Sequence, residues 1–428
     1  MVSKSKISAG IDIGSSKIST IISQISSEEG KINIIGVSSV ASSGIRKGQI
    51  VNIDEASKAI VQSVEAAERM AGYSISHCVI SVGGAHIASQ NSHGIVAVGD
   101  PEGEITPEDV RRVIEAARAV SIPSSREILH VIPRSYTVDS QDGVADPIGM
   151  SGVRLEVETH IITGSTTALR NLTKCVSEVG TSIDCPVFVG IAAAKAVLTE
   201  TEKELGVVLV DIGGGTTSMV IYQEGSPAYT SVLPIGARNV TNDLAIGLRL
   251  SLDAAEKLKL ALSEKEKNLP FVEAKKEEAD EIDLSLLGIE EAKTVSKKTV
   301  VEGIVRPRLN EIFTVVGTEI QKSGLAGMTP SGIVLCGGGA STIGAVEVCK
   351  RTLALPVRIG CPEGMSGLID DIISPAFATS VGLILFAGQK GYESSSRFGL
   401  PNVGKFMGKV QIKGGLGKVL DFIKSFLP

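Results

Sequence analysis

Aromatic residues are scarce in this sequence, and tryptophan is absent. Only 3% of the 428 residues are Phe, Trp or Tyr, although 43% are hydrophobic. A core with so few large rings must be built mostly from Val, Ile, Leu and Ala, which suits β-sheets covered by helices. The length is enough for about two to four units with cores of their own. Composition therefore favours an α/β protein of several domains.

An excess of positive charge and a cluster of metal ligands are also lacking. The formal net charge is −6, and because phosphate binding needs an excess of Lys and Arg, nucleic acid is excluded as the main partner. The six cysteines are scattered without a CxxC pair, which indicates a reducing cytoplasmic compartment. Packing and hydrogen bonding are the expected roles of the histidines, since none has the spacing of a metal motif: His77, His86, His93, His130 and His160.

Long apolar runs are missing too. Because there is no run of ~18 apolar residues, the sequence predicts no membrane-spanning helix, and the polar N-terminus lacks the apolar centre of a signal peptide. Two common phosphate-binding motifs are absent as well. Without GxxxxGK[ST] a P-loop is excluded, and without GxGxxG at the start of a helix a Rossmann dinucleotide site is not expected.

One strand–turn–strand pattern is present twice. It reads "AGIDIGSSKISTIIS" at Ala9–Ser23 and "LVDIGGGTTSMVIY" at Leu209–Tyr222. A tight glycine turn exposes successive backbone N–H groups that bind phosphate oxygens, and an Asp before it binds Mg²⁺ through water. A single hairpin of this kind is usually only a hairpin, but the repetition favours a paired site. The predicted ligands are Asp12, Gly14, Ser15, Ser16 and Lys17 in the first copy, and Asp211, Gly213, Gly214, Gly215, Thr216 and Thr217 in the second.

A third glycine turn follows another predicted strand, in "VLCGGGAS". Its residues Gly337, Gly338 and Gly339 would let the backbone approach a flat base or a sugar.

Two phosphate-binding turns in two similar halves, followed by a late glycine turn, resemble the actin/Hsp70/sugar-kinase ATPase superfamily. This resemblance implies an α/β fold of two lobes, each a mixed sheet with flanking helices and inserted subdomains, which bind ATP and Mg²⁺ between them. In this superfamily a Glu and a Lys one helical turn apart face the nucleoside. Glu256 and Lys259 of "AAEKLK" have that spacing, although an exposed pair on a helix is the alternative.

Within the superfamily, several stretches resemble the FtsA family of bacterial cell-division proteins. They are "ITPEDVRRVIEAAR", "HVIPRSYTVDSQDGVADPIGMSGVRLEVETHIITG", "AVLTETEKELGVVLVDIGGGTT" and "RLNEIF". The likeness covers about residues 7–390. It implies a protein that polymerises with itself, binds the C-terminal peptide of FtsZ and other division proteins, and ties the FtsZ ring to the cytoplasmic face of the cell membrane at the division site.

The same resemblance divides the chain into segments. It implies subdomain 1A at 1–84 and 165–204, an inserted subdomain 1C at 85–164, subdomain 2A at 205–238 and 318–390, subdomain 2B at 239–317, a linker at 391–413 and a membrane-targeting helix at 414–428. The FtsZ peptide is expected at the last insertion, 2B. In "RPRLNEIF", Arg306 and Arg308 would suit a partner's carboxylates and Asn310 its backbone, but a surface helix with ordinary charges is the alternative.

Two positions depart from the family pattern. The family has a Glu at a strand-to-helix join, where it helps to position the attacking water. The matching stretch here is "FVGIAAAKAVL", with Val189 in that place and Gly190 in place of a Pro. Since Val neither accepts a proton nor orients water, we expect nucleotide binding with slow or no hydrolysis. In "LPIGARNVT", Gly236 of the nucleotide site is retained, whereas Ala237 replaces a second glycine.

The end of the chain, "GGLGKVLDFIKSFLP", has the pattern of an amphipathic helix. One predicted face is apolar, with Lys residues on the other, which is typical of a helix that lies in a membrane surface. The alternative is a terminal helix docked on the protein's own core. The residues expected to contact lipid are Leu416, Val419, Leu420, Phe422, Ile423, Phe426 and Leu427.

Other proteins of the same fold remain alternatives to this interpretation. A sugar or acid kinase needs a catalytic Asp aimed at a substrate hydroxyl, and an Hsp70-like ATPase needs a long peptide-binding domain after its ATPase. A pilus-assembly actin-like ATPase would lack the "GMSGVRLE" block and the terminal amphipathic segment. The sequence therefore favours the nucleotide-dependent membrane adaptor over these enzymes.

Overall fold

The computed structural model describes residues 5–26, 31–99, 103–267, 280–290, 294–368, 370 and 372–388. The chain divides into two units, Met1–Tyr392 and Glu393–Pro428, and every described residue belongs to the first. The predicted linker at 391–413 and membrane helix at 414–428 lie outside the described residues. Within the described ranges, every helix is too short or too polar to cross a bilayer.

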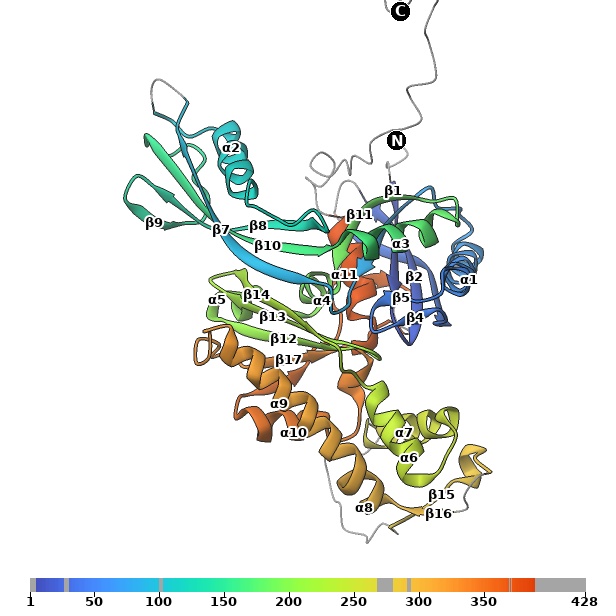
Figure 1. The fold of residues 1–428 in the computed structure, drawn as a ribbon. Coiled ribbons are helices and arrows are strands. Elements are labelled where there is room, and N and C mark those ends of the chain that lie inside the picture. The colour runs from blue at the N-terminus through green and yellow to red at the C-terminus, as the bar shows by residue number, and fades with distance from the viewer. Residues whose placement is uncertain are drawn as a thin grey trace, which may run out of the picture. The chain divides into compact units, whose positions relative to one another are not determined.

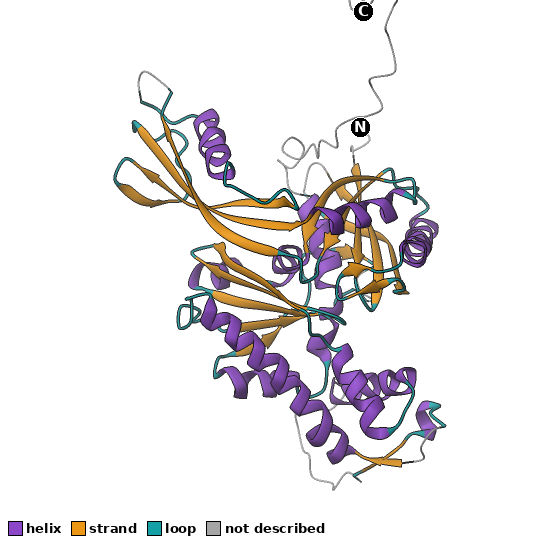
Figure 2. Cartoon of the chain, in the orientation of Figure 1, coloured by secondary structure: helices purple, strands orange, loops and turns teal. Residues whose placement is uncertain are grey.

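The first sheet has six strands in the order β11-β6-β1-β2-β3-β19 (Figures 1 and 2). Its strands are β1 (Ser5–Ile13), β2 (Lys17–Ser26), β3 (Ile32–Ala41), β6 (His77–Val82), β11 (Ser182–Phe188) and β19 (Ser366–Gly367). Helix α1 (Ile53–Ala71) packs on β2 and β3, where Thr20, Ser38 and Ser63 share buried hydrogen bonds. Helix α3 (Thr166–Ser177) packs beside α1 and close to the short β4–β5 hairpin (Ile45–Arg46, Gln49–Ile50).

The second sheet has five strands in the order β14-β13-β12-β17-β18. They are β12 (Val207–Ile212), β13 (Thr217–Gln223), β14 (Ser226–Leu233), β17 (Ile333–Cys336) and β18 (Val357–Ile359). Alternate residues of a strand face opposite sides, so Val207 and Leu209 join the core shared with the first sheet, while Val208 and Val210 face the other core. That other core is covered by α9 (Arg306–Lys322) and α10 (Ala345–Leu353).

Two buried helices connect the first and second sheets. Helix α4 (Val189–Val197) contacts β12 and β13 as well as β6 and β11, and α11 (Ala378–Ala387) packs on α4, β1, β2 and β6. The apolar stretch "DIISPAFATSVGLILFAG" predicts a buried helix whose start is limited by Pro375. The structure confirms this, with a 3₁₀ turn at Pro375–Phe377 before α11. Although the predicted boundaries grouped 318–390 with the second half, both β19 and α11 pack against the first sheet.

A separate antiparallel sheet lies between β6 and α3 in the sequence. Its order is β7-β10-β8-β9, with strands β7 (Ala88–Ala97), β8 (Arg126–Val138), β9 (Gln141–Val144) and β10 (Arg154–Ser165). Helix α2 (Pro107–Arg118) covers one face and encloses a small core of its own (Figure 1). The sequence "TPED" predicts a helix start with Thr106 as the N-cap and an acidic residue three positions later. The structure confirms it, with a capping box formed by Thr106 and Asp109.

The remaining elements follow β14 or precede β12. They are α5 (Glu200–Leu205), α6 (Arg238–Leu248), α7 (Leu252–Lys267), β15 (Glu281–Asp283), β16 (Thr294–Ser296) and α8 (Lys297–Val300). A π-helical segment, Val301–Val305, joins α8 to α9. The sequence "DEASKAIVQSVEAAERMAG" predicts Asp54 as the N-cap of α1, and this is wrong. The cap is Asn52, whose side chain accepts a hydrogen bond from Glu55 N, because Asp54 already lies in the first turn.

Candidate functional site

The two repeated stretches form hairpins with the same register. Asp12 is paired with Ser19 across β1 and β2, and Asp211 is paired with Ser218 across β12 and β13. Each turn is closed by the same backbone hydrogen bond, from Gly14 N to Lys17 O at 3.1 Å and from Gly213 N to Thr216 O at 2.9 Å. The repetition in sequence is therefore a repetition in structure, residue for residue.

The two turns contact each other directly. A Cβ atom built on Gly214 would lie 1.7 Å from Ser16 Oγ, and one on Gly215 would lie 2.9 Å from Ser15 Oγ. Ser15 is fixed in this place because its Oγ accepts a hydrogen bond from Gly48 N at 2.9 Å. The close approach of the first turn therefore leaves no free space for a Cβ atom at either position of the second turn unless a serine side chain moves.

The side chains of the two aspartates reach hydroxyl groups in the protein interior. Ser81 Oγ donates to Asp12 Oδ1 at 2.9 Å and Ser380 Oγ donates to Asp12 Oδ2 at 3.1 Å. Thr379 Oγ1 donates to Asp211 Oδ2 at 3.2 Å. Burial raises the pKa of Asp12, against the hydrogen bond from Ser81. Burial and the nearby charge of Asp12 raise the pKa of Asp211 to about 7.

Lys17 is the cation of the site. Its Nζ lies 3.2 Å from the centroid of the Phe377 ring, a cation–π contact. Burial lowers the pKa of Lys17 to about 8, while the charges of Asp12 and Asp211 act in the opposite direction. The ammonium group of Lys17, which belongs to the first turn, therefore interacts electrostatically with both carboxylates.

The third glycine turn packs behind the second hairpin. Gly337 has φ +80, and a Cβ atom there would lie 2.2 Å from Asp211 Oδ1. A Cβ atom on Gly339 would lie 2.3 Å from Ile212 Cγ2, and only Gly338 of the three is exposed. The predicted turn is therefore in place next to Asp211, and two of its glycines are needed for packing.

Helix α6 connects the second turn to the predicted Glu–Lys pair. Ala237 N donates to Gly213 O and Arg238 N donates to Gly214 O, both at 2.9 Å, so the start of α6 is tied to the turn. Gly236 approaches the same carbonyls, where a Cβ atom would lie 2.6 Å from Gly213 O.

One turn further along α6, Thr241 meets the Glu–Lys pair on α7. Lys259 Nζ donates to Thr241 Oγ1 at 2.9 Å and to Glu256 Oε2 at 2.7 Å. Lys259 is buried, whereas the side chain of Glu256 is 43% exposed. A buried ammonium paired in this way is fixed in position, so the pair differs from an ordinary surface pair.

Val189 is the first residue of α4, directly after β11 ends at Phe188. Its side chain is half-buried and approaches Gly83, where a Cβ atom would lie 3.4 Å from Val189 Cγ1. The sequence placed it at a strand-to-helix join, and the structure confirms that join. The position offers no hydrogen-bonding group to water.

The predicted partner-binding residues lie at the start of α9 and are engaged within the chain. Arg308 pairs with Asp243 through two nitrogens and with Glu311, and Arg306 Nη2 lies 2.6 Å from Glu347 Oε2. Asn310 Oδ1 accepts a hydrogen bond from Thr352 Oγ1 at 2.8 Å. A partner that used these arginines would have to compete with these internal carboxylates.

Several residues of the site were missed by the sequence reasoning. Ser81 is the residue before the end of β6, while Phe377, Thr379 and Ser380 belong to the stretch "SPAFATS", which the sequence predicts only as part of a buried helix. The available signal was the pair of adjacent hydroxyl residues in an otherwise apolar helix. Buried hydroxyls need partners, but the sequence did not show which partners.

The donor set fits a nucleotide with Mg²⁺. Exposed backbone N–H groups, the hydroxyls of Ser15 and Ser16, and Lys17 suit phosphate oxygens, and two carboxylates suit a hydrated Mg²⁺. Among the described residues, no group of three or more His, Cys, Asp or Glu side chains is placed to hold a metal ion. Because Ser16 and Gly214 are in contact, phosphates between the turns require the turns to separate.

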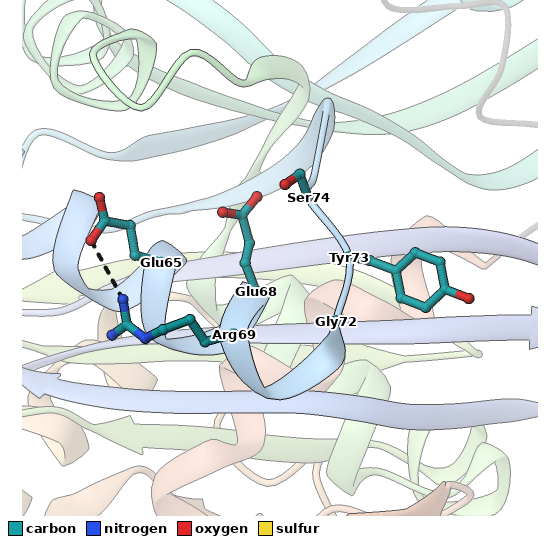
Figure 3. Close-up of a pocket in the computed structure, with 6 residues that line it drawn as sticks. All are labelled: Glu65, Glu68, Arg69, Gly72, Tyr73 and Ser74. Carbon is teal, nitrogen blue, oxygen red and sulfur yellow. Dashed lines mark ion pairs between the residues drawn. The ribbon is translucent and has the colours of Figure 1, made fainter.

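A surface cavity of about 290 Å³ lies elsewhere, at the C-terminal end of α1 (Figure 3). It is lined by Glu65, Glu68, Arg69, Gly72, Tyr73 and Ser74. Glu65 pairs with Arg69 at 3.6 Å, and Glu68 accepts a hydrogen bond from Ile75 N at 2.6 Å. These contacts stabilise the C-terminal end of α1. None of the predicted site residues lines the cavity.

Comparisons with known protein families cover much of the described chain. The family model for "SHS2 domain inserted in FTSA" matches residues 84–163, and the model for "Cell division protein FtsA" matches residues 208–382. The cell division protein FtsA of Pseudomonas aeruginosa is 39% identical over 92% of both chains. FtsA of Neisseria meningitidis is 41% identical, covering 87% of this chain and 88% of its own, and FtsA of Bacillus subtilis is 37% identical, covering 90% and 84%.

Solved structures with a similar fold are much less similar in sequence. The PilM-PilN type IV pilus biogenesis complex matches with a TM-score of 0.62 at 16% identity, covering 90% of this chain and 99% of that one. MreB5 of Spiroplasma citri, solved bound to ADP, matches with a TM-score of 0.50 at 13% identity, covering 89% and 96%. At these identities the likeness concerns the fold, and it confirms the predicted actin-like architecture.

Proposed function

Because this chain belongs to the FtsA family of cell-division proteins and has an actin-like fold, we propose that it binds ATP with Mg²⁺ between its two Asp-bearing turns. The observation that carries the proposal is the pair of hairpins with identical register whose turns meet at Ser16 and Gly214. One turn from each sheet then contacts the same phosphates, and nucleotide binding is coupled to the relative position of the two sheets.

The groups of the site have distinct tasks in this proposal. The backbone N–H groups of Gly214 and Gly215 bind phosphate oxygens, and Lys17 neutralises their charge. Asp12 and Asp211 hold the waters around Mg²⁺, whose chemistry is to neutralise and orient the phosphates when it is bound. Helix α6 starts at the second turn and holds Lys259 through Thr241. In this proposal, Glu256 and Lys259 contact the nucleoside.

We propose slow or no hydrolysis, because the start of α4 carries Val189 where the family has a Glu. The variant Val189→Glu restores a group that orients water, so its ATP turnover should exceed that of the unchanged protein by about tenfold or more. Phosphate release measured on both proteins at equal concentration checks this, and Val189→Leu is the matched control for a change of size without polarity. Efficient turnover by the unchanged protein would contradict the proposal.

The family also supports proposals for assembly. We propose the subdomain limits given above, except that β19 and α11 belong with the first sheet. We also propose self-association into filaments, FtsZ peptide binding at 239–317 with Arg306, Arg308 and Asn310 as candidate contacts, and anchorage of 414–428 on the cytoplasmic face of the cell membrane at the division site. Because a short amphipathic helix binds lipid weakly alone, a filament that presents many tails would bind more strongly.

A deletion separates the anchor from the nucleotide site. A protein ending at residue 413 should lose co-sedimentation with anionic vesicles while its ATP affinity stays within about twofold, because the two functions use different segments. Replacing Leu420 and Ile423 with Asp in the full chain is the matched control, since it keeps the length and removes the apolar face. Undiminished co-sedimentation of both proteins would refute the anchor.

A further inference from the structure

One short segment contacts four residues of the candidate site, Asp12, Lys17, Asp211 and Gly337. In Pro375–Ser380, the Pro375 carbonyl accepts a hydrogen bond from Gly337 N at 2.9 Å. The Phe377 ring makes a cation–π contact with Lys17 Nζ. Thr379 and Ser380, which are adjacent in sequence, donate to Asp211 and Asp12 respectively. The two carboxylates come from different sheets, so this segment is the element at which the two hairpins are joined.

The position of this segment is fixed by close packing on both sides. A Cβ atom on Gly10, two residues before Asp12, would lie 3.0 Å from Leu383 Cβ, and one on Gly382 would lie 1.8 Å from Ala192 O. Helix α11 therefore approaches the backbone of β1 and α4 as closely as glycine allows. Thr379 and Ser380 are buried in this contact, so their hydroxyls have little freedom to turn elsewhere.

The two carboxylates depend on these hydroxyls to different degrees. Asp12 receives two side-chain hydrogen bonds, from Ser81 and Ser380. Asp211 receives one, from Thr379 to Oδ2, while its Oδ1 faces the backbone of Gly337. A buried carboxylate that is held at one oxygen keeps its orientation, and one that is released can rotate toward the ammonium of Lys17.

We propose that Thr379 and Ser380 are positioning residues that hold Asp211 and Asp12 in the mutual orientation needed for a hydrated Mg²⁺, with Thr379 the more important of the two. They act through the carboxylates and do not contact the nucleotide themselves. The inference rests on the proposed nucleotide function and adds to it two residues from the end of the described chain.

The test measures ATP affinity by calorimetry on the full chain, once with Mg²⁺ and once with EDTA. Thr379→Val keeps the shape of the side chain and removes the hydroxyl. It should weaken binding of ATP with Mg²⁺ by about tenfold and leave binding in EDTA within about twofold. Ser380→Ala should lose about threefold in the presence of Mg²⁺, because Ser81 still holds Asp12.

Two further variants separate positioning from folding. Thr379→Ser restores the hydroxyl and should recover the Mg²⁺ dependence. Thr181→Val removes another buried hydroxyl, which donates to Ile75 O at 3.3 Å just before strands β11 and β6, and should leave the Mg²⁺ dependence unchanged. An equal loss with Mg²⁺ and with EDTA in Thr379→Val, or no recovery in Thr379→Ser, would overturn the inference. If the unchanged protein binds no ATP in either buffer, the proposed function itself fails and the inference falls with it.

Discussion

The two hairpins share register and turn but differ in what they offer a ligand. Positions 15 to 17 of the first turn are Ser, Ser and Lys, and the equivalent positions 214 to 216 of the second are Gly, Gly and Thr. The first turn thus offers side-chain hydroxyls and a charge, whereas the second offers backbone N–H groups. Ser15 and Ser16 of the first turn pack against Gly215 and Gly214 of the second. The two turns therefore have complementary shapes, and their residues cannot be exchanged.

The surroundings of the two aspartates differ in the same sense. Asp12 has two hydroxyl donors and is partly exposed, whereas Asp211 has a single hydroxyl donor and is buried against Gly337. The pKa of Asp211 rises to about 7 largely because of burial. The two hairpins therefore have the same backbone but different roles. The first turn carries a charged side chain, and the second turn is closely packed and exposes its backbone.

The largest expected effect on ATP affinity comes from removing the polar group at each of two equivalent positions, Lys17 and Thr216. Lys17→Met removes the ammonium of the site and should weaken ATP binding by about 100-fold, because a charge-assisted contact to phosphate is lost. Thr216→Val should weaken it by about threefold, since the turn keeps its backbone N–H groups. Titration with a fluorescent ATP analogue measures both. Equal losses in the two variants would mean that the turns are interchangeable.

A smaller effect is expected on the free energy of unfolding of the ligand-free protein, which should depend on pH. Asp211 binds its proton more tightly when folded, with a pKa of about 7, than unfolded, where its ordinary value is 3.8. Between these values the folded state holds more protons, so the free energy of unfolding falls as pH rises through this window. Between pH 5 and pH 8 the free energy of unfolding should fall by an amount on the order of 2 kcal/mol.

Urea unfolding at pH 5 and pH 8 in EDTA isolates this contribution. Asp211→Asn lacks the titrating group, so its stability relative to the unchanged protein should be higher at pH 8 than at pH 5. Asp12→Asn should reduce the fall as well, because the charge of Asp12 is one of the causes that raise the pKa of Asp211. A stability difference between Asp211→Asn and the unchanged protein that does not vary with pH would show that Asp211 does not titrate in this range.

The smallest effect tests the contact between the turns. Gly214→Ala places a Cβ atom against Ser16 Oγ and should destabilise the protein by about 1 kcal/mol, because the exposed Ser16 side chain is able to move aside. Ser16→Gly in the same protein should restore the stability. Gly215→Ala should not be rescued by Ser16→Gly, since it meets Ser15, which is held by Gly48 N. Thermal unfolding of the four proteins decides.

The sequence was sufficient to predict the features that depend on nearby residues. The hairpins and the capping box at Thr106 each follow from a short local pattern, whereas the strand-to-helix join at Val189 follows from the resemblance to the FtsA family. The contacts of Thr379 and Ser380 could not be predicted, because their partners lie 168 and 368 residues away along the chain. Likewise, the internal pairing of Arg308 with Asp243 depends on how α6 and α9 pack, which no local pattern specifies.

The most direct test of the paired site is the Mg²⁺ dependence of ATP affinity in Asp12→Asn, Asp211→Asn and the double variant. If both carboxylates hold the same hydrated ion, Mg²⁺ should raise the ATP affinity of the unchanged protein by about tenfold or more and have little effect in either single variant. The double variant should then lose no more than a single one. A Mg²⁺ effect retained in both single variants, or losses that simply add, would contradict a single site shared by the two turns.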